Sequence, residues 1–328
     1  MTKILVIRFS SIGDIVLTTP ILRCIKAQIN DVQLHVLTKH QYGLLFKSNP
    51  NVDVTHEWGG GNKEVARALI AEQFDYVVDL HNNIRTKKIK TFLRTKSSAF
   101  PKLNVQKWLY VNFKWNKLPD IHIVDRYFEA VKKLDVVNDK KGLDYFIPSE
   151  DNVDVLETFK TNKFVAVALG AQFATKRLPN EKLSGILNDI SATIVLLGGK
   201  EDLKIADELI SMIDTDAVYN MCGKLNLNQS ASVVKQANVI LTHDTGLMHI
   251  AAAFKTPIVS VWGNTVPAFG MYPYIIEDPS LYSMHEVKGL SCRPCSKIGF
   301  KKCPHKHFKC MMDQDENEIR EQIIKRLY

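Results

Sequence analysis

The stretch that most constrains the fold is a strand, a polar turn and a helix between Val239 and Ala253. A short apolar run ending at Leu241 leads into the turn His243–Gly246, and a helical pattern follows as far as Pro257. Such a run is typical of a strand buried on both faces, while Asp and Thr favour the first position of a helix. This order of elements turns free backbone N–H groups toward an anion. An ordinary capped turn gives the same pattern, so both interpretations stay open at this point.

Strands alternate with helices in two series, one on each side of residue 150. The expected strands are Lys3–Phe9, Gln33–Thr38, Val52–Trp58, Phe74–Leu80, Phe164–Leu169, Thr193–Leu197, Ala217–Asn220, Val239–Leu241 and Ile258–Trp262. The expected helices are Ile15–Gln28, with Pro20 as its least compatible residue, Lys63–Gln73, His122–Leu134, Asn180–Ile190, Asp202–Met212, Asn228–Gln236 and Asp315–Tyr328. Alternation of this kind predicts parallel sheets, and 328 residues exceed one compact core of ordinary size. We therefore expect an α/β protein with two Rossmann-like domains, residues 1–150 and 151–312, and a last helix in 313–328.

Composition points to a soluble globular protein of the cytosol. Hydrophobic residues make up 45% of the chain and charged residues 24%. No apolar run approaches the roughly 20 residues of a membrane span, and the short apolar run before Arg8 does not fit a secretory signal. Six cysteines in a reducing compartment do not predict a disulfide framework.

Two common nucleotide-binding signatures do not occur in the sequence. The first expected strand is followed by Ser10–Asp14 instead of a G-x-G-x-x-G turn, and there is no G-x-x-x-x-G-K-[ST] loop. Nicotinamide chemistry and ordinary nucleoside triphosphate hydrolysis therefore lose support.

The segment from Arg85 to Lys117 carries the whole excess of positive charge. It holds ten basic residues, no acidic ones and six interleaved aromatic residues, whereas the rest of the chain holds 33 basic and 35 acidic residues. Nucleic acid, an anionic membrane surface or a phosphorylated glycolipid would each attract such a segment, but no familiar nucleic-acid motif accompanies it. We favour the membrane surface and an anionic acceptor, with Arg85, Lys87 and Lys88 as acceptor contacts. Arg126 is a further candidate, although a surface helix accounts for it without a ligand.

The loop after the first expected strand offers a carboxylate. Asp14 follows Ser11 and Gly13 at the start of a helix, where it serves either as a plain cap or as a general base. A base on this loop could reach an acceptor hydroxyl lying across a cleft between the two domains.

Three further loops should meet at the carboxyl ends of the strands in the second half, where open α/β sheets bind ligands. The loop Gly170–Pro179 combines small residues with Lys176 and Arg177, which suits a diphosphate. Gly198–Asp202 could line a base or ribose, and the turn after Leu241 completes the set.

Five segments together resemble glycosyltransferase family 9, the lipopolysaccharide heptosyltransferases. They are IRFSSIGDIVLTTP, GAQFATKRLP, LLGGKED, NMCGKLNL and HDTGLMHIAAAFKTPIVSVWGNT, and they span nearly the whole chain. The resemblance implies a GT-B fold and an inverting transfer of heptose from ADP-heptose to a lipid A–core acceptor, with no cofactor required for catalysis. From the basic segment we also expect peripheral association with the inner face of the cytoplasmic membrane.

The resemblance assigns roles to residues that match the family's motifs. Asp14 falls on the proposed base, and Lys176 falls on the phosphate-contacting lysine. Donor contacts are expected from Ala171, Gln172, Thr175, Lys176, Gly199, Asp244, Thr245, Gly246 and His249. Helix N-termini and Lys176 would stabilise the negative charge that develops on the leaving diphosphate. The last helix is expected to cross back to the N-terminal domain.

A cysteine cluster near the C-terminus has metal-like spacing. It comprises Cys292, Cys295, Cys303 and Cys310, with His305 and His307 as spare ligands. A structural zinc site would secure a loop too irregular to fold alone, whereas reduced thiols or a redox pair are the alternative. Two other functions stay open: a transferase using another nucleotide sugar for a different surface glycan, and a basic nucleic-acid-binding protein with a zinc module.

Overall fold

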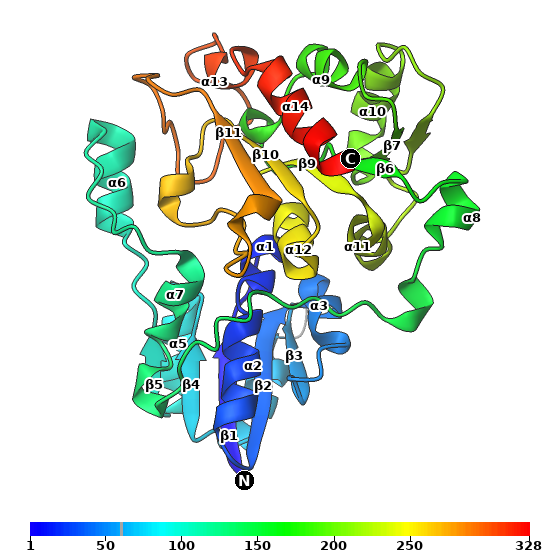
Figure 1. Ribbon diagram of the computed structural model, residues 1–328. Helices are drawn as coiled ribbons and strands as arrows, with labels where there is room; N and C mark the ends of the chain where they lie inside the picture. The colour runs from blue at the N-terminus through cyan, green and yellow to red at the C-terminus, as the bar shows by residue number, and fades with distance from the viewer. Residues whose placement is uncertain (60–61) are drawn as a thin grey trace. The chain divides into compact units, whose positions relative to one another are not determined.

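The computed structural model describes residues 1–59 and 62–328 and divides into two compact units (Figure 1). The first unit comprises Met1–Lys102 and Ile121–Phe146, and the second comprises Leu103–Asp120 and Ile147–Tyr328. Each unit contains a parallel β-sheet with helices packed against it. The predicted α/β fold with two parallel sheets is therefore confirmed.

The sheet of the first unit has the strand order β3-β2-β1-β4-β5, with every described pair parallel. Its strands are β1 (Thr2–Ile7), β2 (Val32–Lys39), β3 (Val54–Trp58), β4 (Tyr76–Asp79) and β5 (Ser97–Ala99). Its helices are α1 (Ile12–Val16), α2 (Thr19–Gln28), α3 (Leu44–Lys47), α4 (Asn62–Ala71), α5 (Ile84–Leu93) and α7 (Ile123–Phe128). The strand order reverses between β1 and β4, so the loops after these two strands flank a switch point, where such sheets bind ligands.

The sheet of the second unit has the order β11-β10-β9-β6-β7-β8 and is also parallel in every described pair. Its strands are β6 (Phe164–Ala168), β7 (Thr193–Leu197), β8 (Val218–Asn220), β9 (Val239–His243), β10 (Ile258–Trp262) and β11 (Tyr282–Glu286). Its helices are α6 (Asn104–Phe113), α8 (Val155–Phe159), α9 (Asn180–Leu187), α10 (Leu203–Ile210), α11 (Leu227–Gln236), α12 (Gly246–Phe254), α13 (Lys309–Met312) and α14 (Glu316–Leu327). Here the switch point lies between β6 and β9.

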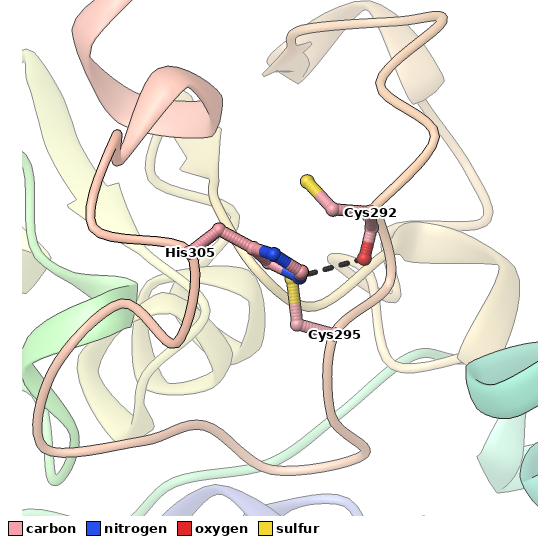
Figure 2. A group of neighbouring side chains, drawn as sticks. All are labelled: Cys292, Cys295 and His305. Atoms are coloured by element: carbon pink, nitrogen blue, oxygen red, sulfur yellow. Dashed lines mark hydrogen bonds between the residues drawn. The ribbon is translucent and has the colours of Figure 1, made fainter.

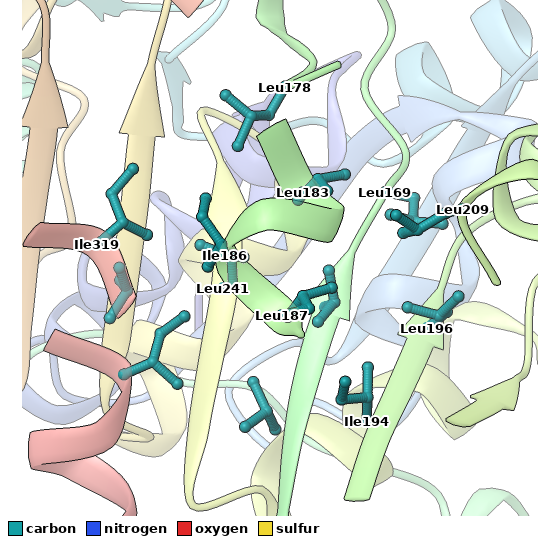
Figure 3. Close-up of a cluster of buried hydrophobic side chains, with 14 of the residues drawn as sticks. Leu169, Leu178, Leu183, Ile186, Leu187, Ile194, Leu196, Leu209, Leu241 and Ile319 are labelled. Carbon is teal, nitrogen blue, oxygen red and sulfur yellow. The ribbon is translucent and has the colours of Figure 1, made fainter. Parts of the chain in front are cut away.

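Aliphatic side chains between this sheet and its helices form the core of the second unit (Figure 3). Leu196 on β7, Leu241 on β9 and Ile186 on α9 are almost completely buried. Truncating such a residue to alanine typically costs about 2–5 kcal/mol. The core therefore fixes the strands whose ends carry the candidate site.

The last helix packs on the second unit. Ile319 and Ile323 of α14 belong to the same buried cluster, and the helix lies against α9 and β9. Asp315 caps its start, accepting hydrogen bonds from the backbone N–H groups of Asn317 and Glu318. The structure therefore assigns α14 to the second unit, although the family resemblance had implied a return to the N-terminal domain.

The chain around Pro20 differs from the single helix Ile15–Gln28 that the sequence predicts. The structure has two helices, and Pro20 lies in the first turn of α2. Proline is tolerated there because the first N–H groups of a helix have no intrahelical partner. Because the chain breaks between α1 and α2, Pro20 does not interrupt the interior of a helix.

The structure also changes the predicted domain boundary within the basic segment. This segment contains α5, β5 and α6, and α6 groups with the second unit although the predicted boundary at residue 150 placed it in the first. Lys114 after α6 donates to the carbonyl oxygens of Cys292 at 3.3 Å and Pro294 at 2.9 Å, and Tyr110 packs edge-on against Phe269. These contacts explain the assignment.

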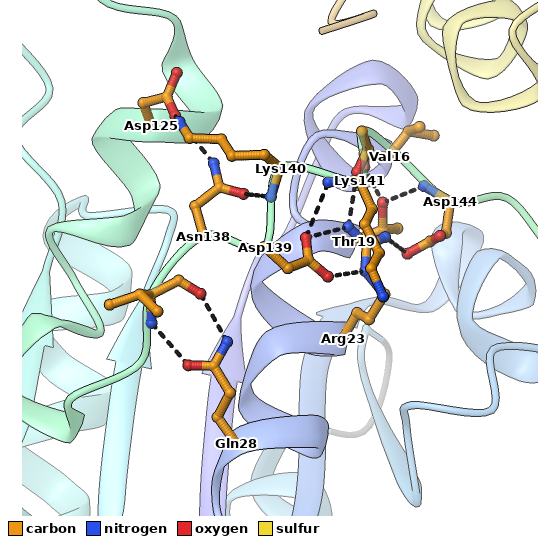
Figure 4. Close-up of polar contacts among 12 residues, drawn as sticks. Val16, Thr19, Arg23, Gln28, Asp125, Asn138, Asp139, Lys140, Lys141 and Asp144 are labelled. Carbon is orange, nitrogen blue, oxygen red and sulfur yellow. Dashed lines mark hydrogen bonds and ion pairs between the residues drawn. The ribbon is translucent and has the colours of Figure 1, made fainter. Parts of the chain in front are cut away.

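Arg23 of α2 fixes the chain segment that leaves the first unit (Figure 4). Its guanidinium pairs with Asp139 at 2.8 Å and with Asp144, and it donates to the carbonyl oxygen of Gly142. The hydrogen bond from Arg23 holds the pKa of Asp139 down to about 2. The segment therefore lies along α2. No helix among the described residues has the length and apolar character needed to cross a membrane.

Candidate active site

The two loops at the switch point of the second unit are joined by an ion pair. Lys176 lies in the loop after β6 and Asp244 directly follows β9, which pairs with β6. The ammonium nitrogen of Lys176 is 2.5 Å from Oδ2 of Asp244 and 3.2 Å from its carbonyl oxygen. The side chains are 16% and 12% exposed, so water screens the pair only in part. The structure thus brings together two residues that the sequence predicted for one site.

The loop after β10 reaches the same carboxylate. The hydroxyl of Thr265 donates to Oδ2 of Asp244 at 2.9 Å, and Thr265 is almost fully buried. Asn264 beside it is 1% exposed, and its side-chain amide lacks a hydrogen-bond partner within the described part of the chain. Both residues lie in the segment WGNT after a predicted strand, but neither is among the expected donor contacts. Their signal was only their place after a buried strand.

Helix α12 begins at this point. Thr245 is its N-cap and has an extended backbone, but its hydroxyl lies near that of Thr242, at 3.3 Å, and does not cap the helix. The first N–H groups of α12, from Gly246 onward, therefore have no cap from this side chain and suit an anion. His249 lies one turn further along α12 and is buried.

Thr175 holds its loop in place through Phe300. Its hydroxyl accepts a hydrogen bond from the backbone N–H of Phe300 at 2.8 Å, and its own N–H donates to the Phe300 carbonyl at 3.2 Å. Ala171 accepts from the guanidinium of Arg177 through its carbonyl oxygen, whereas Gln172 is exposed. Donor contacts from Ala171, Gln172 and Thr175 stay predictions.

The loop after β7 is closed by a buried carboxylate. The N–H of Gly199 donates to Oδ2 of Asp202 at 2.9 Å, and Arg177 lies 3.2 Å from the other oxygen of that carboxylate. Burial raises the pKa of Asp202 above its ordinary value, although the hydrogen bond from Gly199 and the positive charge of Arg177 both act to lower it. A donor contact from Gly199 stays a prediction.

His243 at the end of β9 is a structural residue that the sequence did not single out. Its Nε2 accepts a hydrogen bond from the backbone N–H of Leu178 at 2.9 Å. Burial, with the positive charge of Arg177, lowers the pKa of His243 to about 4. The ring is therefore neutral at pH 7 and ties β9 to the end of the Lys176 loop.

At the switch point of the first unit, Asp14 is held by two neighbours. Its Oδ2 accepts from the N–H and the hydroxyl of Ser11 at 3.0 and 2.9 Å, and its Oδ1 lies 2.6 Å from the guanidinium of Arg8. Burial alone would lower the pKa of Arg8, but Asp14, Tyr127 and other neighbours raise it. Arg8 was not predicted, because it stands at the end of an apolar strand like an ordinary boundary residue.

The predicted acceptor residues differ in exposure. Arg85 on α5 is exposed and its guanidinium lies 5.4 Å from the ring centre of Phe9, just before the Asp14 loop. Lys87 and Lys88 are also exposed, and Gly13 is buried within α1. Arg126, for which a surface helix was the simpler interpretation, is only 4% exposed, and burial lowers its pKa. That interpretation of Arg126 is therefore wrong.

The cysteine cluster brings three ligand atoms together (Figure 2). One sulfur each from Cys292 and Cys295 and one ring nitrogen of His305 all lie within 4.8 Å of one another. The thiol of Cys295 donates to the carbonyl oxygen of Cys292 at 3.0 Å. Burial, followed by the neighbouring thiol of Cys292, raises the pKa of Cys295 to about 12. Soft sulfur and imidazole ligands in this arrangement suit zinc.

Comparisons with known proteins agree with this geometry. The profile of glycosyltransferase family 9 (heptosyltransferase) matches residues 63–297. Lipooligosaccharide heptosyltransferase 2 of Campylobacter jejuni is 26% identical over 321 residues, which cover 95% of this chain and 94% of the relative. The protein of the same name from Haemophilus influenzae is 24% identical over 303 residues, covering 81% and 85% of the two chains.

Solved structures share the fold along the whole chain. A family 9 glycosyl transferase from Veillonella parvula has a TM-score of 0.78 at 21% identity, covering 99% of this chain and 97% of its own. The ADP-heptose lps heptosyltransferase II of E. coli has a TM-score of 0.75 at 18% identity, covering 99% and 98%. The fold is GT-B, and the protein is a glycosyltransferase. The chain belongs to glycosyltransferase family 9, the heptosyltransferase family.

Proposed function

We propose that this enzyme transfers heptose from ADP-heptose to a lipid A–core acceptor with inversion at the anomeric carbon. The observation that carries the proposal is the pairing of Lys176 with Asp244 at the start of α12. An ammonium group and a helix N-terminus at a sheet's switch point form a site for a diphosphate. The names of the relatives supply the sugar and the acceptor class: they are lipooligosaccharide heptosyltransferases, and the E. coli structure is an ADP-heptose enzyme.

Lys176 can contact a phosphate without leaving Asp244. An ammonium group has three N–H donors, and the two contacts to Asp244 use two of them. The third is left for a phosphate oxygen, while Asp244 and Thr265 hold the lysine side chain in place. Lys176 and the α12 N-terminus then stabilise the charge that grows on the departing ADP, each by about 2–4 kcal/mol if they act like oxyanion-hole donors. In this mechanism transfer needs no catalytic cofactor.

Asp14 supplies the base in this proposal. The acceptor hydroxyl attacks the anomeric carbon as the bond to ADP breaks, and Asp14 takes the hydroxyl proton. Arg8 supports this role because its guanidinium stabilises the ionised carboxylate, the form that a base needs. Ser11, Gly13, Arg85, Lys87, Lys88 and Arg126 are the proposed acceptor contacts.

The exposed aromatic residues of α6 and the segment after it support a membrane surface for the acceptor. Trp108, Phe113 and Trp115 are 52%, 50% and 61% exposed, and Phe113 packs against both tryptophans. Lys107 and Lys114 lie in the same segment. Aromatic rings with adjacent lysines are typical of contact with anionic lipid. We therefore place the enzyme in the cytoplasm, bound peripherally at the inner face of the cytoplasmic membrane.

The test is a mass-spectrometric transfer assay with ADP-heptose and purified lipid A–core acceptor. The proposal predicts a product heavier by one heptosyl group and release of ADP. Thermal-shift measurements with ADP-, UDP- and GDP-sugars separate it from a transferase that uses another donor. Salt-dependent binding of nucleic acid without any response to a nucleotide sugar would overturn it in favour of a nucleic-acid-binding protein.

A further inference from the structure

We propose that Cys292, Cys295 and His305 bind one structural zinc ion that secures the loops of the proposed donor site. The first three offer ligand atoms that all lie within 4.8 Å of one another. Figure 2 shows the two cysteines and the histidine projecting toward one another from separate turns of the same loop. Two thiolates and an imidazole supply three corners of the tetrahedron that zinc prefers.

Cys303 and Cys310 are not part of this group of three ligand atoms in the described part of the chain. Cys310 lies at the start of α13 and is 5% exposed. The ligand set therefore differs from the four cysteines that the spacing predicted, because His305 belongs to it and Cys303 and Cys310 do not.

His307 has a different role. Its Nδ1 accepts a hydrogen bond from the backbone N–H of Lys309 at 3.0 Å, so the proton of the neutral ring is on Nε2. That Nε2 lies 3.8 Å from the sulfur of Cys292. It can donate to a thiolate at Cys292 but cannot bind a metal in this tautomer. Partners of this kind orient metal ligands.

The surrounding loop explains why a metal would be needed. Residues 287–308, between β11 and α13, contain no helix or strand. A stretch this long without regular structure is uncommon inside a compact domain, and a closed zinc site supplies folding free energy that such a loop lacks.

The same loop also forms hydrogen bonds with the backbone of the residues that follow β10. Arg293 donates to the carbonyl oxygens of Gly263 at 2.5 Å and Thr265 at 2.9 Å, and the N–H of Cys295 donates to the carbonyl of Asn264 at 3.2 Å. Of these residues, Thr265 donates its hydroxyl to the Asp244 carboxylate. A cation between Cys292 and Cys295 would therefore fix the backbone to which Thr265 and Asp244 are attached.

A second connection runs to the Lys176 loop. Further along the cysteine loop, Phe300 pairs with Thr175 through backbone and hydroxyl hydrogen bonds. Lys114 donates to the carbonyl oxygens of Cys292 and Pro294, which ties the segment after α6 to the same turn. Metal binding would thus stabilise both the Lys176 loop and the basic segment.

The experiment measures metal in the full-length chain purified without chelators or added metal. We expect inductively coupled plasma mass spectrometry to find about one zinc ion per chain. A mercurial that displaces thiolate ligands should release it, as followed with a colorimetric zinc indicator. Replacement by cobalt should give an intense visible band and a sulfur-to-cobalt charge-transfer band. These readouts need no variant and no transferase activity, so their failure and the failure of the proposed function are distinguishable.

Variants then test the ligand set. Cys292→Ser and Cys295→Ser should each lose at least about nine-tenths of the metal. Cys303→Ser, from the same loop, and Cys24→Ser, from the first unit, should retain it. A chain without zinc whose cobalt form has no sulfur band would overturn the proposal, as would iron in place of zinc or a disulfide between Cys292 and Cys295. Loss of metal in Cys303→Ser with retention in Cys295→Ser would overturn the ligand set.

Discussion

The ammonium nitrogen of Lys176 lies 2.5 Å from a carboxylate oxygen of Asp244, although the two residues are 68 positions apart in the chain. They meet because each follows a central strand, and β6 and β9 are neighbours at the point where the strand order reverses. The pair is partly buried, and the hydroxyl of Thr265 donates a further hydrogen bond to the Asp244 carboxylate. The pairing of these two proposed donor residues thus follows from strand order and loop composition.

Asp14→Asn tests the assignment of the base. We expect kcat to fall by about 100-fold or more, because a positioned base typically contributes that much to a proton transfer. Affinity for ADP should stay within about twofold of the wild type, since Asp14 lies in the other unit from the proposed donor loops. Turnover with ADP-heptose and titration with ADP measure the two effects separately.

The control for Asp14→Asn is Asp53→Asn in the same unit. Asp53 pairs with Lys26 at 2.6 Å and lies at the start of β3, away from the Ser10–Asp14 loop in the sequence. It should keep normal turnover. Near-normal turnover in Asp14→Asn would remove Asp14 from the mechanism.

His243 predicts a pH dependence of stability. Its pKa in the folded protein is about 4, against 6.5 for a free histidine, so above pH 6.5 the ring is neutral in both states. As the pH falls from 6.5 toward 4, the unfolded chain takes up a proton that the folded chain does not. The free energy of unfolding therefore falls by about 1.4 kcal/mol per pH unit from this group.

The variant that isolates this effect is His243→Gln, whose amide oxygen can still accept the hydrogen bond from Leu178. Its unfolding free energy should fall less steeply than that of the wild type between pH 6.5 and 4. Chemical denaturation at several pH values measures how the unfolding free energy of each protein depends on pH. The difference in unfolding free energy between the two proteins at pH 7.5 is the reference. Identical slopes would show that His243 is protonated in the folded protein as readily as in the unfolded one.

The exposed tryptophans at and just after α6 predict binding to anionic lipid. The double variant Trp108→Ser/Trp115→Ser should bind phosphatidylglycerol vesicles about tenfold more weakly or worse, because two interfacial side chains are lost. Sedimentation with vesicles measures this, and affinity for ADP should be unchanged. The control is Leu156→Ser, which removes a side chain that is 60% exposed on α8. Equal binding of all three proteins would contradict a role for α6 at the membrane.

Parts of the fold with strong apolar signals were predicted from the sequence. The bounds of Thr193–Leu197 agree with those of β7, and the predicted helix Asn228–Gln236 agrees with α11 to within one residue. Such strands are buried on both faces, and the four residues of β7 after Thr193 are all apolar and buried. By contrast, β11 pairs with one neighbour, β10, and Tyr282–Glu286 has a single buried position, His285. A strand with so few buried positions has no periodic pattern to detect.

The same reasoning separates what was predicted of the site from what was not. Lys176 and Asp244 follow buried strands, and parallel strands align their carboxyl ends, so their meeting could be predicted. The pairing of Arg8 with Asp14 could not, because it depends on side-chain direction at the end of β1. The burial of Arg126 depends on how α7 packs in the first unit, to which the sequence of a short helix gives little guide.

The most direct test of the account is calorimetric titration of ADP into the wild type and two lysine variants. Lys176 and Lys182 each lie 2.5 Å from a carboxylate and are each 16% exposed, but Lys182 pairs with Glu316 of α14. We predict that the wild type binds ADP, that Lys176→Met raises Kd by about 30-fold or more, and that Lys182→Met leaves it within about twofold. Equal affinities in Lys176→Met and Lys182→Met, or a wild type that does not bind ADP, would contradict a donor site at Lys176 and Asp244.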